Sequence, residues 1–297
     1  MRKYAGELGL VLVAIIWGTG FIASAISLEF LSPYQVMAIR FLIAACLMAL
    51  IFMKHLRLLT RPAIMAGIVL GVFLFFAFLL QTLGLQYTTP SKNAFLTAVN
   101  VVIVPFIGFL LYRRGLDKYG LIGAILAIVG VGILSVELNG TFNTGDMLTL
   151  LCAVCFAFHI FFTAEFVKRY APIGLTIVQM FTAFVLSLLV ILVRGETIHF
   201  ALDGRGLLAA SYLGIFSTTV AFLVQTVAQK YTTETKAAII LSTEALFGTL
   251  FSILILHEQL TVRMIIGSIL ILAAVITAET KLAFLQNKMS RRYNGND

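Results

Sequence analysis

Long apolar runs follow one another along almost the whole chain, separated by short polar segments. A run of about 20 residues is long enough to cross a bilayer as a helix. Ten such runs cover residues 8–28, 33–53, 63–83, 91–111, 119–137, 146–166, 172–193, 206–228, 235–256 and 262–281. The pattern predicts an all-α integral membrane fold with ten transmembrane helices.

Prolines support the boundaries of these runs. Four stand at helix starts, where the missing N–H group has no cost: Pro33, Pro62, Pro90 and Pro172. The remaining one, Pro105, lies inside the fourth run, and it is expected to kink that helix.

The composition agrees with a membrane chain. Of 297 residues, 61% are hydrophobic and 11% are charged, against about 25% charged in soluble domains. A net charge of +8 could suggest nucleic-acid binding, but the basic residues sit in short loops, so no nucleic-acid partner is expected. The three cysteines, Cys46, Cys152 and Cys155, are odd in number and lie within apolar runs, so no disulfide framework is predicted.

One stretch of the chain occurs twice. Residues 81–92 have the sequence QTLGLQYTTPSK, and residues 225–236 have the sequence QTVAQKYTTETK, 144 positions later. Farther towards the N-terminus, Pro33 matches Pro172 at an offset of 139. Helices 1–5 therefore correspond to helices 6–10. Because five is odd, the second half must enter the membrane from the opposite side, which predicts two inverted five-helix repeats.

Loop charges predict the orientation. With both termini on one face, that face carries fifteen arginines and lysines and the other face carries three. Cytoplasmic loops are enriched in these residues. We therefore expect a multi-pass protein of the cell inner membrane with both termini in the cytoplasm.

Two segments carry a family resemblance: GLQYTTPSKNAFLTAVNVVIVPFIGFLL at 84–111 and TEALFGTLFSILILHEQLTVRMIIGSILILAAVITAE at 243–279. With Trp17-Gly18 and Arg40, the chain resembles the EamA transporters of the drug/metabolite transporter superfamily. The resemblance implies repeats over residues 1–140 and 141–285, followed by a cytoplasmic tail at 286–297. It also implies transport of small metabolites, often as efflux. The chain departs from the family pattern at Arg113-Arg114-Gly115, where a Glu is usual, and at Glu244-Ala245, where Glu-Pro is usual.

Polar residues within spans are candidate substrate-binding residues, because such groups are costly in lipid. Glu244 lies near the middle of helix 9, and its counterpart in the first half is Asn100. Glu244 either contacts a substrate or a coupling proton, or bonds a broken helix end. In helix 4, Asn93, Thr97 and Asn100 share one face. That face lines a cavity or supplies interhelical hydrogen bonds.

Further candidates lie on other helices. Gln81 and Gln225 are repeat counterparts near the ends of helices 3 and 8, and His159 shares a helix face with Cys152 and Cys155. That face offers three ligands with no evident fourth, so no metal site is predicted. Trp17 lies in the middle of helix 1, either as a contact for an apolar or cationic substrate or as a core residue.

Three basic residues and a glycine pair complete the candidates. Lys92 and Lys236 fall in the first turns of helices 4 and 9, after predicted N-caps at Thr89 and Thr233. They either extend to lipid phosphates or bind an anionic group of a substrate. Arg40 is expected to extend to the membrane interface. Gly67 and Gly71 predict a close helix contact.

The leading hypothesis is an alternating-access secondary transporter of small amphipathic metabolites, amino acids or related compounds, acting as an exporter. An importer or facilitator of a vitamin, nucleoside or drug-like solute is the alternative, and a non-transport assembly subunit is the second alternative. An enzyme is not predicted, because no pair of mid-span aspartates and no zinc-protease motif is present. The expected partners are a small-molecule substrate, the lipid bilayer and, as a candidate coupling ion, protons. No cofactor is predicted, and a monomer or weak homodimer is expected.

Overall fold

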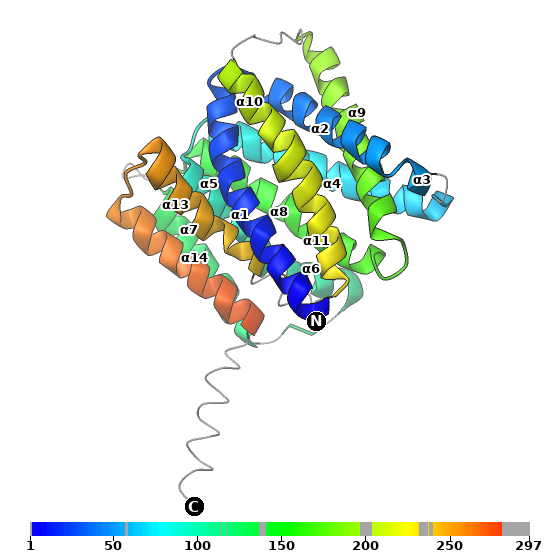
Figure 1. Ribbon diagram of the computed structural model, residues 1–297. Helices are drawn as coiled ribbons and strands as arrows, with labels where there is room; N and C mark the ends of the chain where they lie inside the picture. Colours follow the sequence, from blue (N-terminus) through cyan, green and yellow to red (C-terminus); the bar gives the residue numbers. More distant parts are fainter. Residues whose placement is uncertain are drawn as a thin grey trace, which may run out of the picture.

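A computed structural model describes residues 2–56, 59–113, 115–116, 118–136, 141–196, 204–231, 237 and 240–280. Within these residues the regular structure is helical, apart from one isolated bridge between Val136 and Phe142. The elements are α1 (Arg2–Leu28), α2 (Pro33–Ile51), α3 (Met53–Leu56), α4 (Arg61–Leu85), α5 (Pro90–Ala98), α6 (Asn100–Tyr112), α7 (Lys118–Ser135), α8 (Thr144–Phe166), α9 (Pro172–Arg194), α10 (Gly204–Tyr212), the π-helix η1 (Leu213–Val220), α11 (Ala221–Gln229), α13 (Glu244–Leu256) and α14 (Val262–Thr280) (Figure 1).

The described helices have the lengths and surfaces of membrane spans. Eight segments among the described residues are long and apolar enough to cross a bilayer, and two shorter apolar helices cover Ile240–Leu256 and Val262–Ala278. Large apolar side chains such as Leu110 and Val193 are exposed on the outside of the bundle. A soluble surface would not carry so much exposed apolar area. The prediction of an all-helical, multi-pass membrane protein is confirmed.

Local sequence sets the helix starts. Ser32, Thr60 and Thr89 each accept a hydrogen bond from the backbone N–H three residues later, and a proline follows within the first two helical positions. These side chains satisfy N–H groups that would otherwise lack a partner at a helix start. The N-cap predicted at Thr89 is confirmed, whereas Thr233 lies outside the described residues.

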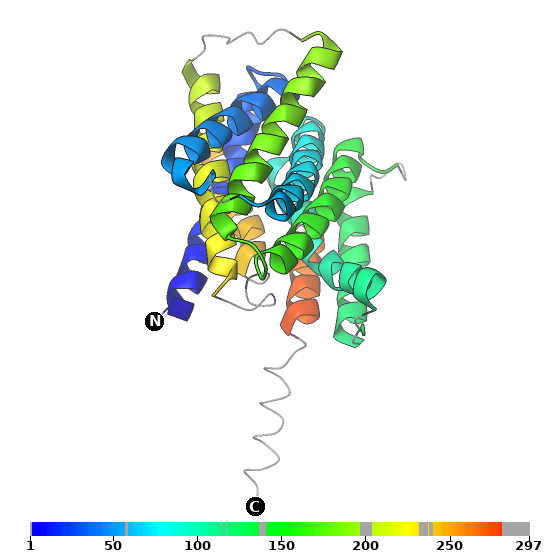
Figure 2. The ribbon, with the colours of Figure 1, turned by 90° about the vertical axis from the view of Figure 1, so that its right-hand side faces the viewer.

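Glycines allow the helices to approach closely. Gly67 and Gly71 of α4 lie against Val178 and Thr182 of α9, so the predicted close contact is confirmed. Gly130 of α7 faces the backbone of Gly267 of α14 in the same way. The start of α1 and the end of α14 lie at the same end of the bundle (Figures 1 and 2).

The helices in the fourth and ninth apolar runs are interrupted at matching places. One interruption is at Val99, between α5 and α6, and the other is at Thr243, just before α13, 144 residues later. At each place the chain forms a tighter turn: Val102 N–H donates to Val99 O and Leu246 N–H donates to Thr243 O, both at 3.0 Å. Asn100 and Glu244, the residues that follow, therefore begin new helical segments.

Proline does not explain these interruptions. Pro105, which was expected to kink the fourth helix, lies inside α6, six residues after the interruption. The equivalent position in the second half is Thr249, and the ninth run is likewise interrupted six residues before it. Because the break occurs with and without a proline, Pro105 does not account for it.

Candidate functional site

A cavity lies inside the bundle between helices of both halves of the chain. It encloses about 510 Å³ of empty space, including its opening. The lining residues are Trp17, Gly20, Phe21, Ser24, Arg40, Phe78, Gln81, Thr97, Asn100, Phe156, His159, Ile160, Ser217, Phe222, Gln225 and Glu244. They come from α1, α2, α4, α5, α6, α8, η1, α11 and α13. The lining combines aromatic rings with a small number of polar groups, as small-molecule sites in proteins do.

Most of the predicted substrate-binding residues meet at this cavity. Trp17, Gln81, Thr97, Asn100, His159, Gln225 and Glu244 line it. Lys92 and Asn93 do not belong to the lining, and Lys236 lies outside the described residues. Residues that are far apart in sequence, from position 17 to position 244, are thus brought to one place.

Aromatic rings form the apolar part of the lining. The ring of Phe222 lies 5.1 Å from that of Trp17 and 5.8 Å from those of Phe78 and His159, measured between centroids. Phe156 packs on Phe78 at 5.2 Å in an edge-to-face arrangement. Aromatic contacts of this geometry are favourable, so these rings build a firm apolar wall.

The π-helix η1 shapes the cavity opposite Trp17. The indole Nε1 of Trp17 donates a 2.9 Å hydrogen bond to the backbone oxygen of Ser217. The hydroxyl of Thr219 bonds to Gly214 O, five residues earlier, at 2.7 Å. Such short π-helical segments recur at functional sites, because the wider turn frees backbone groups for other partners. The apolar run at 206–228 predicted a regular helix here, although the polar Ser217-Thr218-Thr219 cluster within it was a usable signal.

Arg40 was expected at the membrane interface, and that expectation is wrong. Its side chain is buried and lines the cavity. Its Nε donates a 3.1 Å hydrogen bond to the hydroxyl of Thr218, and its guanidinium carbon lies 3.9 Å from the centroid of the Phe78 ring. The cation–π contact and the hydrogen bond hold the guanidinium inside the protein. The α2 helix is apolar on all sides, so the sequence pattern did not indicate which side faces the interior.

Several amide groups at the cavity have unused hydrogen-bonding capacity. Both polar atoms of the Gln225 amide and the carbonyl oxygen of Asn100 are buried without a hydrogen-bond partner among the residues that the structure describes. Gln81 Nε2 donates to the hydroxyl of Thr97 at 3.1 Å, and His159 Nε2 lies 2.8 Å from Gln179 Oε1. A buried polar group without a partner is costly, so the cavity can offer donors and acceptors to a polar ligand.

Asn93 binds neighbouring helices. Its amide nitrogen donates to Gln81 O at 3.2 Å and to the Thr149 hydroxyl at 2.9 Å. Of the helix face predicted from Asn93, Thr97 and Asn100, the last two line the cavity while Asn93 supplies interhelical hydrogen bonds. The face thus serves both of the roles considered for it.

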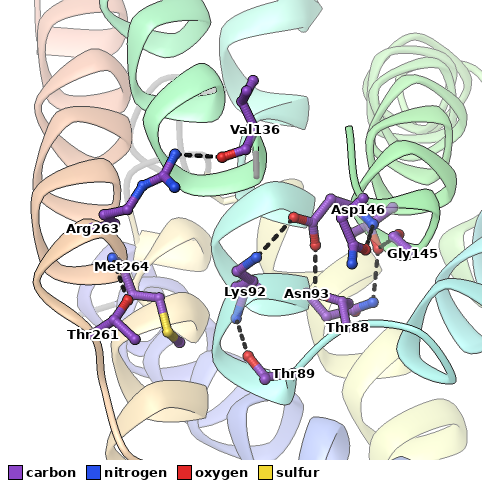
Figure 3. A network of polar contacts seen from close by, with 12 residues as sticks. Thr88, Thr89, Lys92, Asn93, Val136, Gly145, Asp146, Thr261, Arg263 and Met264 are labelled. Carbon is purple, nitrogen blue, oxygen red and sulfur yellow. Dashed lines mark hydrogen bonds and ion pairs between the residues drawn. The ribbon is translucent and has the colours of Figure 1, made fainter. Parts of the chain in front are cut away.

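Lys92 forms an ion pair with the second half of the chain. Its Nζ lies 3.1 Å from Asp146 Oδ2 in the first turn of α8, and Thr88 donates a hydrogen bond to the other carboxylate oxygen. Figure 3 shows Lys92 directed at Asp146, with Asn93 and Gly145 beside them. The ion pair gives Lys92 a protein partner in place of the lipid phosphate or substrate anion that was considered.

Comparison with known proteins identifies the family. The model of the EamA-like transporter family matches twice, over residues 4–136 and 143–279. The chain belongs to the EamA-like transporter family. An uncharacterized transporter of Archaeoglobus fulgidus is 37% identical over 281 residues, covering 95% of this chain and 87% of that protein. An uncharacterized transporter of Clostridium kluyveri is 24% identical over 293 residues, covering 93% of both.

A solved structure shares the fold. It is described only as the crystal structure of a protein, and it superimposes with a TM-score of 0.68 at 18% identity, covering 95% of this chain and 99% of that one. The family match and the relatives together confirm the resemblance drawn from the two sequence segments. They make the chain a multi-pass membrane protein of a transporter family.

Proposed function

We propose that the chain is an alternating-access secondary transporter of small amphipathic solutes, amino acids or related compounds, acting as an exporter. The observation that carries this proposal is the cavity, which both halves of the chain line with repeat-related residues. Gln81 and Gln225 are 144 positions apart, as are Asn100 and Glu244. In inverted-repeat transporters the substrate site lies at the junction of the repeats.

The proposed architecture is ten transmembrane helices in two inverted repeats of five. The matching interruptions at Val99 and Thr243 support it, because discontinuous helices place backbone ends at the substrate sites of such transporters. The helix ends after these interrupted runs agree too: Arg113 and His257, again 144 positions apart, both adopt the left-handed conformation, with φ of 52° and 54°.

Contacts near the start of α5 would close one end of the cavity. Lys92 is paired with Asp146, and Ser91 donates two hydrogen bonds to Glu258, at 3.2 Å from its N–H and 2.7 Å from its hydroxyl. All of these bonds join the first half of the chain to the second. In an alternating-access cycle they break when the cavity opens towards this end and form again when it closes.

Liposome flux tests the proposal. A thermal-shift screen of amino acids, nucleosides, vitamins and cationic drugs selects ligands, since binding to the folded state raises its apparent stability. Purified protein in liposomes is then expected to exchange a selected solute faster than protein-free liposomes do. Gln225→Leu should lower the rate at least tenfold, and Gln86→Leu, at an exposed position after α4, should leave it unchanged.

The flux result also separates the alternatives. No exchange of any selected solute would contradict a transporter and favour a membrane assembly subunit. Loading everted and right-side-out vesicles with the same solute decides between export and import. Repeating the exchange with a pH gradient tests protons as the coupling ion, because a proton-coupled carrier uses that gradient to accumulate its solute against the solute's own concentration gradient.

A further inference from the structure

An arginine and a glutamate line the cavity without pairing with each other. Arg40 of α2 is 1% exposed and Glu244 of α13 is 7% exposed. Neither forms an ion pair with another residue in the part of the chain that the structure describes. Buried charges in proteins are normally paired, because the loss of water must be compensated. A cavity that holds an unpaired arginine and an unpaired glutamate therefore suits a ligand that supplies a partner for each.

The guanidinium of Arg40 is arranged to receive an anion. Its Nε is used by Thr218, while its terminal N–H groups have no acceptor among the described residues. The ring of Phe78, 3.9 Å from the guanidinium carbon, fixes the plane of the group. A planar guanidinium with free terminal donors binds a carboxylate through two parallel hydrogen bonds.

The carboxyl group of Glu244 is arranged to receive a cation. It stands at the first position of α13, just after the interruption at Thr243, and it has no hydrogen-bond partner among the described residues. Asn100 and Gln225, which line the same cavity, have side-chain carbonyl oxygens without partners in the described part of the chain. An ammonium group has three donors, so these oxygens together suit one ammonium group.

Part of the lining is apolar. Trp17, Phe222 and Phe156 present aromatic rings, and their surfaces favour a hydrocarbon side chain over a charged one. A solute with a carboxylate, an ammonium group and an apolar side chain would therefore find a matching surface for each part.

We propose that the cavity binds its solute as a zwitterion, with Arg40 on the carboxylate, Glu244 on the ammonium group and the apolar side chain against Trp17 and Phe222. The proposal rests on the proposed transport function and names its substrate class. It makes Arg40 a specificity residue, and it excludes simple cations and simple anions as preferred solutes, because each would leave one buried charge without a partner.

The protein carries its own reporter for this test. Trp17 is the single tryptophan of the chain and it lines the cavity, so its fluorescence responds to occupancy. Full-length protein in detergent is titrated with L-leucine, with L-leucinamide, which lacks the carboxylate, and with 4-methylpentanoate, which lacks the ammonium group. L-leucine should change the Trp17 emission saturably, and each analogue should bind at least tenfold more weakly.

Two variants assign the groups. Arg40→Gln should weaken L-leucine binding at least tenfold and leave L-leucinamide binding within threefold of the parent. Glu244→Gln should give the crossed result, weakening L-leucine and sparing 4-methylpentanoate. Arg40→Lys, which keeps the charge but loses the planar fork, should fall between the parent and Arg40→Gln. A general loss of structure would weaken all ligands alike, so it cannot imitate the crossed pattern.

The proposal is overturned if L-leucine binds no better than its analogues to the parent protein, or if both variants weaken all three ligands equally. Should a variant fail to fold, the analogue series on the parent decides alone. The liposome flux assay distinguishes failure of the zwitterion proposal from failure of the proposed transport function. Flux of a cationic drug or nucleoside without flux of L-leucine would support the transport function and contradict a zwitterionic substrate. The absence of flux for every solute would contradict both proposals.

Discussion

Lys92 and Asp146 join the two halves of the chain through a 3.1 Å ion pair in which Asp146 is fully buried and the Lys92 side chain is 19% exposed. Asp146 lies in the first turn of α8, where the helix dipole also favours a negative charge. Thr88 adds a hydrogen bond to the same carboxylate. The lysine, by contrast, sits in the first turn of α5, where the dipole opposes it, so its position is explained by the aspartate.

Removing the lysine should therefore destabilise the protein more than removing the aspartate. Lys92→Met leaves a buried carboxylate without its counter-ion, and we expect a loss of about 3 kcal/mol in the free energy of unfolding. Asp146→Asn should cause a smaller loss, because the partly exposed Lys92 can turn to water. Thermal unfolding in detergent measures both, with Lys54→Met at an exposed position as the control, expected to change stability by about 0.5 kcal/mol or less. If Lys92→Met destabilises the protein no more than the control does, the ion pair does not contribute to stability.

The membrane class of the fold and most of the candidate site could be predicted from the sequence. In a bilayer, apolar length sets the helices, and a polar residue within a span needs a reason to be there. That rule found Gln81, Asn100, Gln225 and Glu244, which meet at the cavity. It succeeded because the cost of a polar group in lipid does not depend on knowing its neighbours.

The parts that could not be predicted depend on tertiary partners. The orientation of Arg40 is decided by Thr218, 178 positions away, and the ion pair of Lys92 by Asp146, 54 positions away. A few of the 25 phenylalanines line the cavity. Their spacing along the sequence does not distinguish them from the phenylalanines that face lipid. Membrane helices that are apolar on all sides have little periodic signal to show which face is internal.

The contact between α4 and α9 depends on Gly71. A Cβ at this position would lie 2.5 Å from the Cβ of Thr182 and 2.8 Å from the backbone oxygen of Gln179, so the helices would have to separate. We expect Gly71→Ala to destabilise the protein by about 1–3 kcal/mol, as overpacking does. Gly132→Ala is the matched control, because nothing lies within 4 Å of a Cβ there. It should leave the unfolding temperature unchanged or raise it, since alanine favours helix. Equal losses for both variants would contradict the close packing.

The left-handed residues at two helix ends offer a stabilising change. Arg113, after α6, and His257, after α13, are exposed and have positive φ, which is unfavourable for a residue with a Cβ. Arg113→Gly and His257→Gly should each raise the free energy of unfolding by about 1 kcal/mol. Gly195→Ala should have the opposite effect, because Gly195 ends α9 with φ of 64°. Unfolding temperatures of the three variants test this, and a loss of stability in both glycine variants would show that the side chains matter more than the backbone.

The proposed inverted arrangement of the halves predicts opposite sidedness for two repeat-related positions. Glu29 follows α1 and Lys168 follows α8, 139 positions apart, the offset that relates Pro33 to Pro172. Both are exposed. In a background with Cys46, Cys152 and Cys155 replaced by alanine, Glu29→Cys should react with an impermeant maleimide added to intact cells. Lys168→Cys should react only after permeabilisation, because five spans separate the two positions. The background without cysteine should not react at all. Reaction of both positions from outside would show that the two halves have the same orientation, and it would contradict the inverted repeat. Reaction of Lys168→Cys alone would keep the inversion and place both termini outside the cytoplasm.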